Sequence, residues 1–255
     1  MAARISEPGS FLVPCLLSAD ARETVRRAGS GNNEDYTVAK RTAFVTIGQA
    51  PRVDLTPEIL KEVKCPLDVV EIGVLDGLDD DAIAALAPVD GEQRLVSRLA
   101  DGREVILGKS KIQQRLQQLF NELDGEGYDL IVLLCTGHFE RFHLRTLFIE
   151  PQQVVDHFVR GLAYGAETLG ILVPDKKQID EFHGIDGKTS KVTFASPYSG
   201  DRMQAAGREL SETDMIVMHC MGYSEVMRRQ IAEASGRPVM LSRRLVAHAI
   251  DLILT

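Results

Sequence analysis

The chain has 255 residues, of which 44% are hydrophobic and 26% are charged, so it can bury a substantial core and form one large domain or two small ones. Its net charge of -8 and its scattered basic residues exclude a broad nucleic-acid surface, and its apolar runs are too short to cross a bilayer. We therefore expect a soluble, cytoplasmic protein with no nucleic-acid or membrane partner.

Residues 1–40 mix glycine, serine, asparagine and charged residues without helical or strand periodicity, so we expect an appendage that is flexible. A short apolar run at residues 11–17 is interrupted by Pro14, which argues against a secretory signal. The same run could dock on a second copy of the chain, and a homodimer is the assembly that we consider.

From residue 42 onward, short apolar or β-branched runs alternate with amphipathic stretches. The amphipathic residues 111–123 predict a helix with one apolar face, and residues 242–254 predict a final helix. Strands that alternate with helices indicate parallel sheets. The runs that we expect to be buried strands are residues 43–47, 67–72, 130–134, 168–173, 215–218 and 238–241.

Residues 95–107 interrupt this alternation. They are typical of two strands around Asp101-Gly102, a dipeptide that favours a tight hairpin turn. The whole pattern predicts an α/β fold with two lobes. We expect residues 41–150 plus 238–255 to form the first lobe and residues 151–237 to form the second.

Two of the predicted strands end at a cysteine that is followed two residues later by glycine, in LLCTGH and in MHCMGYS. Open α/β sheets bind ligands beyond the carboxyl ends of their strands, so we expect Cys135 and Cys220 to face one site. A single buried cysteine more often serves only as a small hydrophobic residue, but the pair of cysteines favours a catalytic role for the thiols. Backbone N–H groups, or the imidazoles of His138 and His219, would lower the pKa of the thiols, although each histidine fits a structural role equally well.

The other two cysteines, Cys15 and Cys65, lie outside such turns and receive no chemical role. The four cysteines show neither CxxC nor Cys-His ligand spacing, which argues against a zinc site and against a disulfide framework. We therefore expect free thiols and no metal.

The first predicted strand ends in TIGQAPR. Gly48 permits a close approach, and Gln49 and Arg52 could hold a carboxylate, Arg52 through a bidentate fork. The alternative is a surface turn with a solvated arginine. The rest of the expected substrate-binding set lies around the two cysteines and comprises Thr136, Gly137, His138, Gly222, Tyr223 and Ser224.

Through TIGQAPR, VSRLADGREV, GYDLIVLLCTGHF, LFIEP, LGILVP and DMIVMHCMGYS, the sequence resembles the AroM family over about residues 42–254. AroM proteins are similar in turn to the Asp/Glu/hydantoin racemase superfamily. The resemblance implies two pseudo-symmetric lobes with parallel, doubly wound sheets, each of which offers one cysteine to the cleft between them. The chain departs from amino-acid racemases in Thr136, in Met221 and in the absence of an Asp-Ser-Gly first loop.

The activity implied by the resemblance is that of a cofactor-independent racemase or isomerase acting on a small carboxylate or a related carbonyl compound. One of Cys135 and Cys220 would remove a proton from the carbon beside the carboxylate, and the other would supply a proton from the opposite face. Two alternatives stay open. They are a decarboxylase or lyase that uses one cysteine, and a non-catalytic protein that binds a carboxylate metabolite.

Overall fold

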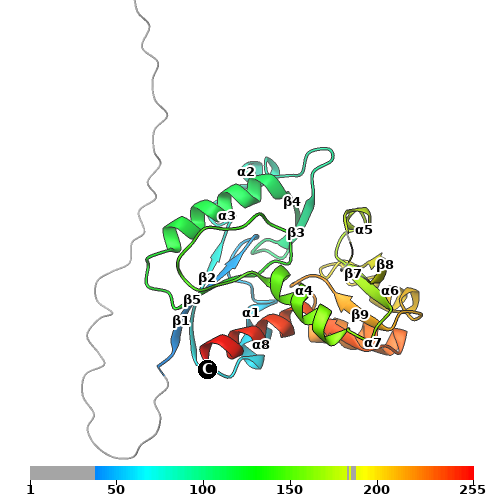
Figure 1. The fold of residues 1–255 in the computed structure, drawn as a ribbon. Coiled ribbons are helices and arrows are strands. Elements are labelled where there is room, and N and C mark those ends of the chain that lie inside the picture. Colours follow the sequence, from blue (N-terminus) through cyan, green and yellow to red (C-terminus); the bar gives the residue numbers. More distant parts are fainter. Residues whose placement is uncertain (1–37, 183, 185–187) are drawn as a thin grey trace, which may run out of the picture. The chain divides into compact units, whose positions relative to one another are not determined.

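The structure is a computed structural model, and it describes residues 38–182, 184 and 188–255 (Figure 1). This part of the chain contains two four-stranded sheets and one two-stranded sheet. The appendage expected at residues 1–40 lies almost entirely outside the described residues. Within the described ranges, every helix is too short or too polar to span a lipid bilayer.

The first sheet is parallel and is covered by helices on both faces. Ala43 and Val45 pack with α3 (Lys109–Leu123) and α2 (Asp80–Ala84), whereas Phe44 packs with α1 (Thr56–Glu62) and α8 (Ser242–Leu254), on the opposite face (Figure 1). Burial on both faces explains why its central strands are continuous apolar runs. Across the sheet the strands are β2 (Leu67–Gly73), β1 (Lys40–Thr46), β5 (Leu130–Leu133) and β6 (Phe148–Ile149).

The second sheet is also parallel. One face is covered by α6 (Met203–Glu209) and α7 (Glu225–Ser235), and the other by α4 (Pro151–Leu162) together with the start of α8. A short helix, α5 (Gln178–Glu181), precedes its edge strand. Across the sheet the strands are β10 (Val239–Leu241), β9 (Met215–Met218), β7 (Thr168–Val173) and β8 (Thr189–Phe194).

The expected lobe boundary needs one correction. Residues 238–255 were assigned to the first lobe, but β10 is hydrogen-bonded to β9 and therefore lies in the second sheet. Only α8, the helix that follows β10, packs on the first lobe, since Val246, Ala247 and Ile250 of α8 contact Phe44 on one face of the first sheet. The chain thus passes back to the first lobe between β10 and α8.

The two sheets have the same internal topology. In each one the first strand along the chain lies between the second and the third, with the fourth outside the third. The strand order therefore reverses between β1 and β5 in one sheet and between β7 and β9 in the other. Ligands of open α/β sheets bind beyond the carboxyl ends of the strands at such reversals. This repeated arrangement, with helices on both faces, confirms the predicted fold class.

The predicted hairpin is confirmed by β3 (Arg94–Arg98) and β4 (Glu104–Gly108), which pair antiparallel. Its turn places Gly102 at φ +94°, a conformation that favours glycine. The hairpin contacts both lobes. The N–H of Gln49 donates to the carbonyl of Arg98 at 3.2 Å, and Gln178 Nε2 donates to the carbonyl of Arg94 at 2.8 Å.

Candidate active site

A cavity of about 80 Å³ lies beyond the carboxyl ends of the strands where the order of each sheet reverses. Cys135 follows β5 and Cys220 follows β9, and both line this cavity. Its volume suits a small molecule, since one water needs roughly 10–15 Å³ of such space. The residues of the predicted site that line it are Arg52, Cys135, Thr136, Gly137, His138, Cys220 and Gly222.

The two thiols are held in the same way. The N–H of Gly137 donates to Cys135 Sγ at 3.3 Å, and the N–H of Gly222 donates to Cys220 Sγ at 3.4 Å. A Cβ on Gly137 would lie 2.7 Å from Leu95 Cδ2, so a side chain there would require Leu95 to move. We expected these N–H groups to hold a carboxylate, but in this structure they hold the sulfur atoms.

Burial dominates the ionisation of both thiols. Desolvation raises the pKa of Cys135 to about 12, and the opposing N–H of Gly137 is too weak to reverse it. Desolvation also raises the pKa of Cys220, against the N–H of Gly222 and the positive charge of Arg52. The sequence predicted lowered pKa values, which is wrong for the ligand-free cavity, because one N–H dipole does not offset the loss of water around a thiolate.

His219 does not supply a positive charge to the thiols. Burial, together with the neighbouring His138, lowers the pKa of His219 to about 4, so its imidazole is neutral at physiological pH. The rings of His138 and His219 lie 6.2 Å apart, nearly parallel. His219 lines the cavity, is 8% exposed, and its Nε2 has no hydrogen-bond partner among the described residues. This nitrogen is available for a hydrogen bond with a bound ligand.

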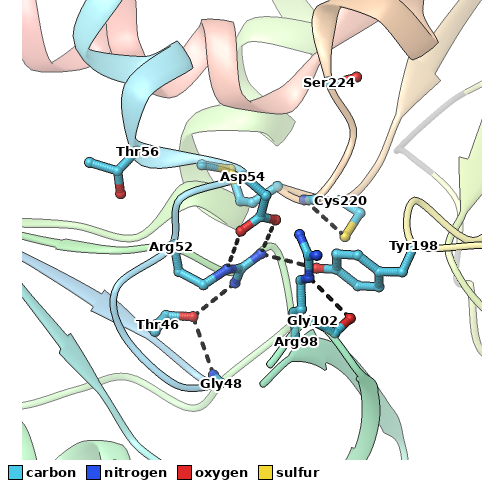
Figure 2. A network of polar contacts seen from close by, with 12 residues as sticks. Thr46, Gly48, Arg52, Asp54, Thr56, Arg98, Gly102, Tyr198, Cys220 and Ser224 are labelled. Atoms are coloured by element: carbon cyan, nitrogen blue, oxygen red, sulfur yellow. Dashed lines mark hydrogen bonds and ion pairs between the residues drawn. The ribbon is translucent and has the colours of Figure 1, made fainter. Parts of the chain in front are cut away.

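Arg52 is at the centre of a polar network between the two lobes (Figure 2). Its Nε and Nη2 donate to the carboxylate of Asp54 at 2.9 and 2.8 Å, and its Nη1 donates to Thr46 Oγ1 at 3.0 Å. Nη2 also donates to Tyr198 Oη at 3.1 Å. The bidentate fork that we expected to bind the substrate therefore binds Asp54.

Arg52 and Asp54 both remain charged. Burial is the largest single effect and opposes the charge on each side chain, but the hydrogen bonds and the nearby opposite charges together outweigh it, so the pKa of Arg52 is raised and that of Asp54 is lowered. The arginine thus contributes a positive charge, paired with Asp54, at the edge of the cavity, and it also donates to Thr46 and to Tyr198.

Two of the predicted site residues shape the loop after β1 and do not line the cavity. A Cβ on Gly48 would lie 2.3 Å from the carbonyl oxygen of Arg98, so glycine is needed for the close approach of the hairpin. Gln49 Oε1 accepts from the N–H of Ala100 at 2.9 Å. Both residues fix the hairpin against the first lobe.

Tyr223 and Ser224 are also absent from the cavity lining. The hydroxyl of Tyr223 donates to the carbonyl of Ala195 at 2.8 Å, inside the core of the second lobe. Ser224 Oγ accepts from the N–H of Met227 and caps the start of α7. Their side chains therefore hold the segment after Cys220 in place.

The sequence missed part of the cavity wall. Tyr198 follows β8, a strand that was not predicted, so the strand-end rule could not find it. Lys109 is the first residue of α3 and looked like an ordinary start of a helix. The lining residues that were outside the predicted set include Gln93, Arg94, Lys109, Gln178, Glu181, Tyr198 and His219.

Family membership follows from the sequence as a whole. The family model described as AroM protein matches residues 42–254. The chain belongs to the AroM family. Among curated proteins, no sequence matches this AroM family member significantly.

Three solved structures show the same fold as this AroM family member. Aspartate racemase from Picrophilus torridus has a TM-score of 0.55 at 11% identity and covers 85% of this chain and 94% of that chain. Maleate isomerase Iso from Pseudomonas putida S16 has a TM-score of 0.53 at 13% identity, covering 84% and 93%. Allantoin racemase from Klebsiella pneumoniae has a TM-score of 0.51 at 13% identity, covering 85% and 88%. The predicted resemblance to the AroM family is confirmed, and the likeness to these three structures shows a shared fold.

Among the residues of the AroM chain that the structure describes, Cys65, Cys135 and Cys220 are free thiols. No group of three or more His, Cys, Asp or Glu side chains within that part of the chain is arranged to hold a metal ion. Cys65 is buried but does not line the cavity.

Glu150 lies just before α4 of this AroM protein, and its buried Oε1 has no hydrogen-bond partner among the described residues. Burial raises the pKa of its carboxyl from 4.5 to about 7. Its contribution to stability is therefore complete below about pH 4.5, where the folded and unfolded states both carry the proton, and is lost as the pH rises through 7.

We expect Glu150→Gln to raise the melting temperature at pH 8, where the wild-type carboxylate is ionised and poorly solvated, and to change it little at pH 5. Thermal unfolding followed by circular dichroism at both pH values measures the difference. Glu122→Gln, on the exposed side of α3, is the control and should show no such pH dependence. An equal shift at both pH values for Glu150→Gln would contradict the assignment.

Proposed function

We propose that this AroM protein is a cofactor-independent racemase or isomerase that moves a proton on a small carboxylate or related carbonyl compound. The observation that carries this proposal is that Cys135 and Cys220, at equivalent positions of two sheets with the same strand order, line one cavity. The fold shared with two racemases and an isomerase supports it. Sequence identity of 11–13% leaves the substrate open.

The reaction needs one thiolate and one thiol. The thiolate removes a proton from the carbon beside the carboxylate and becomes a thiol, which leaves an enolate. The other thiol then gives its proton to the opposite face of that carbon and becomes the thiolate. Because burial raises the pKa of both thiols, the thiolate is the minor form at neutral pH, and we expect the reaction rate to rise with pH.

Tyr198 is placed to stabilise the enolate. Its oxygen accepts a hydrogen bond from Arg52 at 3.1 Å, and Arg98 lies over its ring with the guanidinium 5.9 Å from the ring centre (Figure 2). Burial raises the pKa of Tyr198, so the hydroxyl keeps its proton. That proton has no acceptor among the described residues, and Tyr198 lines the cavity. A donor that is polarised by Arg52 can bind charge developing on the substrate oxygen.

We expect Tyr198→Phe to slow the reaction by about 10²-fold, as the loss of one preorganised donor does in other enzymes. Arg52 keeps Asp54 and Thr46 as partners, so the fold should be unaffected. Tyr164→Phe removes a hydroxyl from a residue that is 86% exposed and serves as the control, with an unchanged rate expected. An unchanged rate in Tyr198→Phe would show that the enolate is stabilised elsewhere.

The function itself is tested by proton NMR in heavy water with a panel of small chiral carboxylates, after a thermal-shift screen for those that bind. A substrate should exchange its α-proton with solvent and lose optical activity. Ligands that stabilise the protein but never exchange would instead identify a carboxylate-binding protein. Release of carbon dioxide or cleavage of the ligand would identify a one-cysteine decarboxylase or lyase.

A further inference from the structure

The lining of the cavity contains two arginines and one lysine, and both arginines are ion-paired within the protein. Arg52 is ion-paired with Asp54 at 2.8 Å, and Arg94 is ion-paired with Asp175 at 3.4 Å. Lys109 differs. Its Nζ donates at 2.8 Å to the amide oxygen of Gln93, which is uncharged, and no described carboxylate lies within ion-pairing distance of it. Of these three side chains, Lys109 is therefore the one without an ion-pair partner among the described residues.

The position of Lys109 is not explained by its own helix. It is the first residue of α3, where the exposed N–H groups already create positive potential and a cation is disfavoured. The carboxylate at this terminus belongs to Glu92, which accepts from the N–H of Ser110 at 2.8 Å. An anion inside the cavity would be a favourable partner for both Lys109 and the helix terminus.

Three further polar groups of the lining residues are buried without a hydrogen-bond partner among the described residues: Nε2 of His219, Nε of Arg94 and Oγ of Ser97. The neutral imidazole of His219 can share a hydrogen bond with a ligand. The lining also contains one carboxylate, Glu181, which accepts from the N–H of Arg94 at 3.1 Å. Glu181 repels an anionic group and Lys109 attracts one, so such a group is favoured at Lys109.

We propose that Lys109 binds the carboxylate of the ligand, in the role that we expected for Arg52. The inference rests on the proposed function for its ligand class, a small carboxylate. Arg52 cannot take this role through its fork, which holds Asp54, and the N–H groups of Gly137 and Gly222 hold the cysteine sulfurs. Lys109 is thus the binding and specificity residue, and Tyr198 interacts with the oxygen at which charge develops.

Protection of Cys135 and Cys220 from alkylation reports occupancy of the cavity without knowledge of the natural ligand. The full-length protein is treated with iodoacetamide at pH 9, and labelling is mapped by mass spectrometry. The probes are propionate, butyrate and lactate, each compared at equal ionic strength with its uncharged amide. We expect at least one carboxylate to protect both thiols at a concentration about tenfold lower than its amide, as one charged hydrogen bond implies.

Lys109→Met and Lys109→Gln should remove this preference for the carboxylate, whereas Lys109→Arg should keep part of it. Lys111→Met is the matched control, because Lys111 lies in the same helical turn but bonds the carbonyl of Ala85 outside the cavity, and the preference should remain. Equal protection by every carboxylate and its amide, or an undiminished preference in Lys109→Met, would overturn the inference.

Exchange of the α-proton, followed in the same samples, separates this inference from the proposed function. If protection depends on Lys109 but no chiral carboxylate exchanges its α-proton, the binding role of Lys109 is supported and the racemase activity is excluded. If exchange is as fast in Lys109→Met as in the wild type, the racemase activity is supported and the binding role of Lys109 is excluded.

Discussion

Cys135→Ser and Cys220→Ser are each expected to reduce the interconversion of enantiomers by about 10⁴-fold, the upper range for loss of a general acid or base. Each thiol serves one face of the reacting carbon, and a serine hydroxyl is too weak an acid to take over the proton cycle. Polarimetry with any substrate found in the heavy-water screen measures interconversion. Cys65→Ser, at a buried thiol outside the cavity, should leave the rate unchanged.

The two serine variants should also differ from each other. The thiolate that survives can still remove and return a proton on its own side, so each variant should exchange only one enantiomer with solvent, and the enantiomer should differ between Cys135→Ser and Cys220→Ser. Wild-type interconversion in either variant would exclude the two-base mechanism. If only one substitution matters, the one-cysteine decarboxylase or lyase becomes the better account.

Arg243→Met is expected to destabilise the protein by about 3–4 kcal/mol, because it leaves buried carbonyl groups without donors. Arg243 is 2% exposed. Its Nε and Nη2 donate to the carbonyl of Met221 at 3.1 and 2.8 Å, and its Nη1 donates to the carbonyl of Asp54 at 3.1 Å and to Glu58 at 2.8 Å. It thereby joins the segment after Cys220 to the loop that carries the Arg52 network.

Urea denaturation at constant pH measures this effect. Arg244→Met is the neighbouring control. Arg244 is 43% exposed and lies 3.9 Å from both Glu62 and Glu225, so its loss should cost less than about 1 kcal/mol. A similarly small cost for Arg243→Met would mean that water satisfies the carbonyls of Met221 and Asp54.

The sequence was sufficient where burial on both faces leaves a local signal. The apolar runs at residues 130–134 and 215–218 gave β5 and β9, and the strand-end rule then gave Cys135 and Cys220, which line one cavity. It was insufficient at the sheet edges. The edge strand β8 has the sequence TSKVTF, in which polar and charged residues hide the strand, and Tyr198 was missed with it.

The chemistry of the side chains was harder to predict, because it depends on burial and on partners. The sequence around Arg52 suits an arginine that binds the carboxylate of a ligand through two hydrogen bonds. In the structure these two hydrogen bonds go to Asp54, only two residues away. The pKa of Cys135 is raised, since the desolvation that raises it arises only when both lobes enclose the thiol. Both facts depend on how the folded chain packs, which spacing and composition do not specify.

The β3–β4 hairpin makes the cavity unequal on its two sides. Along the chain it lies between β2 and β5, the second and third strands of the first sheet. In the described part of the second lobe, the equivalent connection between β8 and β9 contains α6 and no hairpin. The hairpin supplies cavity residues from Arg94 to Ser97. If the protein is a racemase, the reaction that it catalyses has an equilibrium constant of one. The value of kcat/KM must then be equal for the two enantiomers, however asymmetric the cavity is. The hairpin can therefore give one enantiomer a lower KM only together with a lower kcat, and it can never bias the final mixture.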